Sequence, residues 1–166
     1  MTNADIATLI LRVAVGLCIF LHGANKWRSP ESRSGTAGWF GSIGMRRPKL
    51  QAAAAAFTEM IGGLFLVAGL VVPTAAGAVG STMVVAIVVA HRRNGFFIFN
   101  EGQGWEYCGI LLSICVALGA LGGGTASLDH ALGWEYSGNM GVVTTLIIVI
   151  FAPFLHLALS YRPKTV

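Results

Sequence analysis

Residues 6–27 read IATLILRVAVGLCIFLHGANKW, an apolar run that closes on a histidine and a lysine. The run at 6–21 approaches the ~20 residues that an α-helix needs to cross ~30 Å of hydrocarbon. No basic leader precedes it and Arg12 lies inside it, so we expect a retained helix and not a cleaved signal peptide. The stretch predicts a membrane-spanning helix with ionisable side chains within it and at its end.

Four further apolar runs follow, at 52–72, 74–90, 107–121 and 142–159. Of the 166 residues, 55% are hydrophobic and 11% are charged, whereas an ordinary soluble domain carries about 25% charged residues. The runs lack the alternating pattern of barrel strands, and lipid admits only helices or closed barrels. The sequence therefore predicts an all-α, polytopic membrane bundle with five spans.

The basic residues collect on one side of the membrane when five spans are threaded alternately. The other side receives the N-terminus, the VVPT turn and the loop SLDHALGWEYSGN, whose acidic residues are Asp129 and Glu135. Because cytoplasmic loops carry an excess of lysine and arginine, we expect the N-terminus outside and the C-terminus in the cytoplasm. The net charge of +4 then needs no nucleic-acid partner. The basic side holds Lys26, Arg28, Arg33, Arg46, Arg47, Lys49, Arg92, Arg93, Arg162 and Lys164.

The first loop, at about 28–48, is long and contains the amphipathic piece TAGWFGSIGM. This piece is too short to span the bilayer. It suits a half-helix that lies in the interface or re-enters the bundle. Both alternatives stay open at this point.

Ionisable residues gather in the half of the bundle nearest the basic side. At a rise of ~1.5 Å per residue, Glu59 lies roughly 13 Å from the basic surface, His22 roughly 6 Å and Arg12 roughly 20 Å. A charge at such depth costs ~2.5–3.5 kcal/mol, so it should face the interior and find a partner. We expect Arg12 to pair with Glu59, either to set helix register or to form part of a pocket. The candidate site residues are Arg12, His22, Lys26, Glu59, His91 and Glu106.

A histidine and a carboxylate in an apolar cavity can hydrogen-bond a quinone carbonyl and move the protons that accompany its reduction. The same groups could bind a substrate carboxylate or form the relay of a transporter. The three cysteines form no C-x-x-C pair, and GALGGGTAS lacks the lysine of a phosphate-binding loop. We therefore expect no metal or nucleotide and consider quinone as the candidate cofactor. His156 could ligate haem, but no intramembrane histidine of clear register pairs with it.

Seven motifs over residues 8–133 together resemble the DoxX family of small bacterial membrane proteins. In chain order they are LILRVAVG, HGANKW, GTAGWFGSIGM, EMIGGLFLVAGL, VVAIVVAHRRNGFF, GWEYCGILL and SLDHALG. The resemblance implies a four-helix membrane bundle, and Arg12, His22, Lys26, Glu59, His91, Glu106 and Asp129 look like the family's polar positions. Ser127 and Asp129 also suit the N-cap and first turn of a short outer helix.

The family resemblance also implies a role beside oxidoreductases of the bacterial plasma membrane. The family is named for a small subunit associated with thiosulfate:quinone oxidoreductase or terminal quinol oxidase, and members have been linked to oxidative-stress defence. We expect a membrane subunit that binds quinone or lipid in a polar pocket in the cytoplasmic half and associates with other membrane-protein subunits. A non-catalytic scaffold and a small transporter stay open as alternatives.

The C-terminal part departs from the family pattern. We expect residues 1–133 to form the DoxX-like bundle and residues 134–166 to add a transmembrane helix and a short cytoplasmic tail. Pro153 should kink the added helix. Its apolar side chains offer a lateral surface for docking to another protein.

Overall fold

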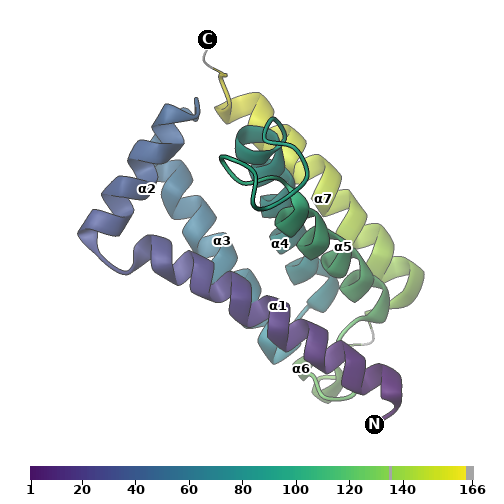
Figure 1. The fold of residues 1–166 in the computed structure, drawn as a ribbon. Helices are drawn as coiled ribbons and strands as arrows, with labels where there is room; N and C mark the ends of the chain where they lie inside the picture. The colour runs from purple at the N-terminus through teal and green to yellow at the C-terminus, as the bar shows by residue number, and fades with distance from the viewer. Residues whose placement is uncertain (135, 164–166) are drawn as a thin grey trace.

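The computed structural model describes residues 1–134 and 136–163, so Glu135 and Lys164 lie outside the described residues. Within these ranges the chain folds into helices that run back and forth, with its termini at opposite ends (Figure 1). The all-α prediction is confirmed. The elements are α1 (Asn3–Trp27), α2 (Pro30–Ser42), α3 (Pro48–Ala68), α4 (Val72–Ala86), the π-helical turn η1 (Ile87–His91), α5 (Glu106–Leu121), α6 (Leu128–Ala131) and α7 (Gly138–Ser160).

Four helices of the described chain are long and apolar enough to span a membrane: α1, α3, α4 continued by η1, and α7. The prediction of a polytopic membrane bundle is confirmed. The expectation of five full-length spans holds for four, because α5 has 16 residues and rises only about 24 Å. Gly122 ends this helix with a φ of 69°, a conformation that glycine adopts without strain.

The packing of α1 on α3 and of α4 on α5 and α7 places the loops and termini at two ends of the bundle. The loop at 92–105 and the C-terminal end of α7 lie at one end, which α2 also approaches, whereas the N-terminus and α6 lie at the other (Figure 1). The loops that the alternating threading predicts on the basic side therefore lie together at one end of the bundle. The assignment of the basic end to the cytoplasm stays a prediction.

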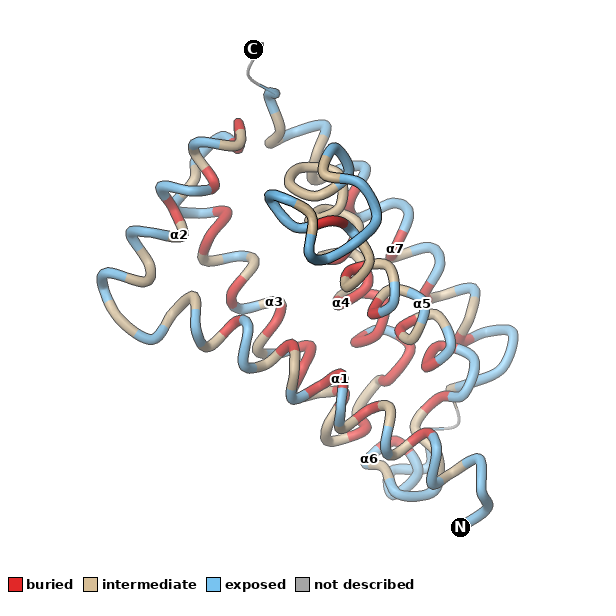
Figure 2. Tube along the Cα trace, viewed as in Figure 1, coloured by how far each residue is buried: buried red, intermediate tan, exposed pale blue. Residues whose placement is uncertain are grey.

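Glycines bring the backbones of α1 and α3 together. A methyl group on Gly63 would lie 2.5 Å from the carbonyl oxygen of Gly16, and one on Gly23 would lie 2.6 Å from that of Ala56. The small face of α1 that carries Gly16 and Gly23 therefore meets α3, as small residues do at membrane helix contacts. Buried residues follow this contact and continue along α4 (Figure 2).

The substitution Gly63→Ala should lower the melting temperature, because the added methyl group overlaps the backbone of α1 at Gly16 and Phe20. Overpacking of this kind costs about 1–3 kcal/mol. Gly35→Ala is the matched control, because nothing lies within 4 Å of a methyl group at that position in α2. Equal melting temperatures of the two variants in detergent would contradict this view of the α1–α3 contact.

The first loop forms α2, which begins six residues before the predicted amphipathic piece. Ser29 caps this helix by accepting a hydrogen bond from the amide of Ser32, and Pro30 occupies its first turn. The segment after α2 is tied to the end of α7, because the amide of Arg46 donates to Ser160 O at 2.8 Å and that of Arg162 donates to Gly44 O at 2.9 Å. The α2–α3 link and the end of α7 thus meet across the basic end of the bundle.

Candidate functional site

A cavity of about 510 Å³ lies in the half of the bundle nearest the basic end. Its walls come from α1, α2, α3, α4 with η1, the loop at 92–105, α5 and α7. Most lining side chains are apolar, and the rim includes the exposed residues His22, Trp39 and Gln103. Of the six predicted site residues, the cavity brings together His22, Lys26, Glu59 and His91. Arg12 and Glu106 do not line it.

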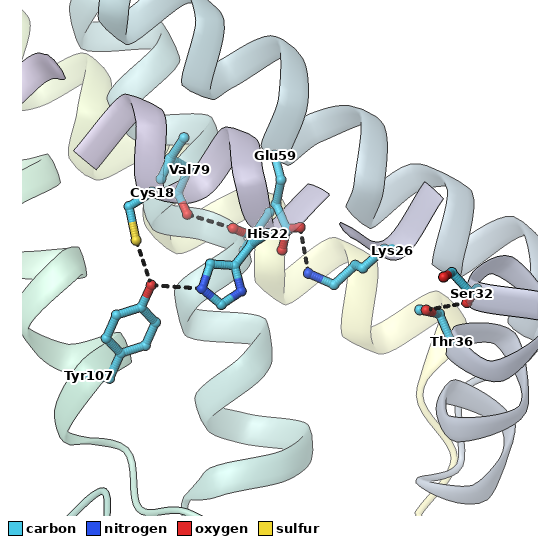
Figure 3. A network of polar contacts seen from close by, with 9 residues as sticks. Cys18, His22, Lys26, Ser32, Thr36, Glu59, Val79 and Tyr107 are labelled. Carbon is cyan, nitrogen blue, oxygen red and sulfur yellow. Dashed lines mark hydrogen bonds and ion pairs between the residues drawn. The ribbon is translucent and has the colours of Figure 1, made fainter. Parts of the chain in front are cut away.

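Lys26 and Glu59 form the ion pair of the cavity wall, with 2.5 Å between Nζ and Oε2. The two side chains point toward each other from α1 and α3 (Figure 3). The Glu59 side chain is 8% exposed and that of Lys26 is 23% exposed, so the lysine lies nearer the rim. The pair places one cation and one anion beside walls whose side chains are mostly apolar.

The predicted pairing of Arg12 with Glu59 is wrong. Helices α1 and α3 run in opposite directions, and Arg12 lies level with Leu66 and Val67, whose carbonyl oxygens accept hydrogen bonds from its guanidinium. Those residues are about two helical turns from Glu59, or roughly 12 Å along α3. The glycine contacts set the register of α1 against α3, and this register places Lys26, not Arg12, beside Glu59.

Arg12 instead belongs to a hydrogen-bond network at the end of the bundle opposite the basic residues. Its guanidinium is fully buried and also donates to Ala126 O at 2.6 Å. The nearby Asp129 carboxylate accepts hydrogen bonds from the amides of Val71 at 2.7 Å and Val72 at 3.0 Å, at the start of α4. Val71 has a φ of 42°, which is strained for a β-branched residue. Arg12 and Asp129 thus hold the α3–α4 turn to α1 and to the loop before α6.

Asp129 also occupies the first turn of α6, whose N-cap Ser127 accepts a hydrogen bond from the amide of His130. The predicted short helix with its Ser127 cap is therefore confirmed, whereas its place on the outer side of the membrane stays a prediction. The sequence did not predict that Asp129 also contacts the start of α4, a helix that comes earlier in the chain.

A hydrogen-bonded chain reaches the cavity from α1 and α5. The hydroxyl of Tyr107 lies 3.1 Å from Nε2 of His22 and 3.0 Å from Sγ of Cys18 (Figure 3). A hydroxyl has one proton and two acceptor lone pairs, so it can link the thiol to the imidazole. His22 and Tyr107 both line the cavity, which gives the wall a group that can take up or release a proton.

His91 ends the π-helical turn that extends α4. Its Nδ1 lies 2.9 Å from the carbonyl oxygen of Gln103. A carbonyl only accepts, so Nδ1 is the donor and Nε2 is the acceptor of the neutral ring. Single π-helical turns inside α-helices occur frequently at functional sites.

Glu106 holds the loop at 92–105 and does not reach the cavity. Its carboxylate accepts a hydrogen bond from the amide of Ile98 at 3.0 Å. Ile98 lines the cavity, so Glu106 acts on the site by positioning this loop residue. The side chain of Asn94 supports the same loop by donating to Gly102 O and Gln103 O.

Sequence reasoning missed Tyr107, Gln51 and His156 as cavity residues. Tyr107 stands directly after Glu106 at the start of an apolar run, a position that is also typical of interfacial aromatics. His156 is an intramembrane histidine, which is by itself a signal for a functional site. Among the described residues, no group of three or more histidine, cysteine or acidic side chains could hold a metal ion.

The fold and the cavity define a small multi-pass membrane protein with an ion pair and three histidines, His22, His91 and His156, around one cavity. The chain belongs to the DoxX family, whose family model matches residues 7–92. It is also 34% identical over 114 residues to "Putative oxidoreductase CatD" of Bacillus subtilis (strain 168), an alignment that covers 69% of this chain and 79% of that protein. No solved structure matches the chain.

Proposed function

We propose that the cavity binds the head of a lipid-soluble quinone, and that the chain is the membrane subunit of a quinone-linked oxidoreductase or oxidative-stress complex. The observation that carries this proposal is an apolar cavity of about 510 Å³ into which a few polar groups converge. Ligand pockets have this size and this character, with a small number of polar groups to orient the ligand. The oxidoreductase named among the relatives supports the same direction.

The polar residues have distinct roles in this proposal. Reduction of a quinone takes two electrons and two protons, and the electrons come from the partner oxidoreductase. Tyr107 and His22 exchange protons with the head group, since their side chains are already hydrogen-bonded to each other. Lys26 and Glu59 place a balanced pair of charges beside the head. His91 offers Nε2 as an acceptor for a quinol hydroxyl.

The setting of this function is the bacterial plasma membrane, with the N-terminus outside and the cavity in the cytoplasmic half. The positive-inside rule supports this orientation. Large apolar side chains are exposed along α1, α3 and α7, as a lipid-facing surface requires. Among the four helices long enough to span the membrane, α7 is the least buried, which leaves room for lipid or a partner subunit.

The test is native mass spectrometry of the protein extracted from its own membrane in mild detergent, with bound lipids and quinones identified. We expect about one quinone per chain together with oxidoreductase subunits. Ala86→Phe is the control, because Ala86 lines the cavity and a larger side chain there should fill it and displace the quinone. A lone protein without quinone would favour a scaffold, and saturable substrate uptake by liposomes would favour a transporter.

A further inference from the structure

The C-terminal helix forms part of the cavity wall. Ala152, Pro153 and His156 of α7 line the cavity, although α7 lies outside the segment that the family model matches. The other side of α7 is exposed, with Phe154 and Leu155 pointing away from the protein. The helix therefore does more than offer an outer surface for docking.

The end of α7 is held so that this face stays turned inward. Ser160 follows His156 by four residues and so lies on the same helix face. Its hydroxyl accepts a hydrogen bond from Nε2 of Gln51, which itself lines the cavity, at 3.0 Å. Its carbonyl oxygen accepts the amide of Arg46 at 2.8 Å. These bonds tie α7 to α3 and to the α2–α3 link one turn beyond His156.

His156 brings an unpaired polar atom to this wall. Within the described residues, Nε2 of His156 and Nε of Arg12 are the buried side-chain nitrogen or oxygen atoms without a hydrogen-bond partner. The Arg12 guanidinium satisfies its terminal nitrogens with three carbonyl oxygens. His156 has no such compensation, and a buried donor or acceptor without a partner destabilises the protein. Nε2 is enclosed by its neighbours although His156 lines the cavity, so the imidazole has to turn toward the cavity for a ligand oxygen to supply the missing partner.

We propose that His156 is a ligand-contacting residue whose Nε2 hydrogen-bonds an oxygen of the bound head group. The proposal rests on the proposed function, since it names a contact within the same cavity. The neutral imidazole donates from one ring nitrogen and accepts at the other, and the tautomer can change. Nε2 can therefore donate to the carbonyl of a quinone and accept from the hydroxyl of a quinol. A saturated apolar lipid tail would offer it neither partner.

The experiment measures binding of decylubiquinone to the full chain in detergent micelles through quenching of tryptophan fluorescence, because Trp39 lines the cavity. His156→Leu should weaken binding roughly tenfold, the equivalent of one hydrogen bond. His156→Gln keeps a polar group at this position and should recover most of the affinity. His130→Leu is the matched control, because His130 lies on α6 at the other end of the bundle and is exposed.

A second readout separates ligand contact from a structural role. Nε2 of His156 has no partner in the protein, so the melting temperature without ligand should not fall in His156→Leu. Equal affinities of the wild type and His156→Leu would overturn the inference and leave the proposed function standing. No binding by the wild type would overturn the proposed function itself. If His156→Leu does not fold, His156→Phe decides, with unchanged affinity again overturning the inference.

Discussion

Arg12→Ala should lower the free energy of unfolding by about 3–5 kcal/mol, the cost of breaking a buried charged network by removing one partner. The substitution removes the guanidinium hydrogen bonds to the carbonyl oxygens of Leu66, Val67 and Ala126. It also removes the cation near Asp129, the carboxylate that caps α4 at the strained Val71. The measurement is the melting temperature in detergent together with the fraction of monodisperse protein in size-exclusion chromatography.

Two controls sharpen the Arg12 prediction. Arg28→Ala removes an exposed arginine just after α1 and should leave stability unchanged within about 0.5 kcal/mol. Arg12→Lys keeps the charge but loses the planar fork that reaches three carbonyl oxygens, so its melting temperature should fall between those of the wild type and Arg12→Ala. A stable Arg12→Ala protein that has lost quinone would contradict the structural role and return Arg12 to the site.

Glu59→Gln should abolish measurable quinone binding, or weaken it at least roughly tenfold, while the protein remains folded. The substitution removes the counter-ion of Lys26 beside the cavity, and an uncompensated charge at this depth is costly. The lysine is then expected to turn toward the rim and disturb the head-group position. The measurement is the dissociation constant for decylubiquinone, with the melting temperature recorded on the same sample.

The double substitution Lys26→Met/Glu59→Met separates a site from a structural ion pair. It removes both charges and replaces them with flexible apolar side chains, so stability should return to near the wild-type value. Binding should stay lost, because the head group then meets no charged pair. Recovery of binding in the double variant would show that the pair serves only the fold.

The membrane class and the element order could be predicted from the sequence because hydropathy is a property of each segment by itself. A run such as 6–21 must span or be buried wherever its neighbours lie. The sequence also places Arg12, Gly16 and Gly23 on one face of α1, because residues 4 and 11 positions apart lie close together around a helix. The face packs against α3 as that geometry indicates.

The pairing of charges could not be predicted in this way. Arg12 and Lys26 lie on the same face of α1, and either could in principle meet Glu59. The choice depends on the register of α1 against α3, which the close contact of Gly16 with Gly63 sets. A single turn of slip along α3 moves a side chain by about 5 Å, more than a salt bridge tolerates.

The cavity residues also divide into those that the sequence could identify and those that only the packing of the helices reveals. Lys26, Glu59, His22 and His91 could be selected by depth, because depth follows from the distance of each residue to the end of its own helix. Glu106 has a suitable depth but supports Ile98, and His156 completes the wall from a helix far along the chain. The depth of a residue depends only on its position along its own helix, so it can be calculated from the sequence. The direction in which each helix turns its side chains depends on its neighbours, and only the folded bundle decides it.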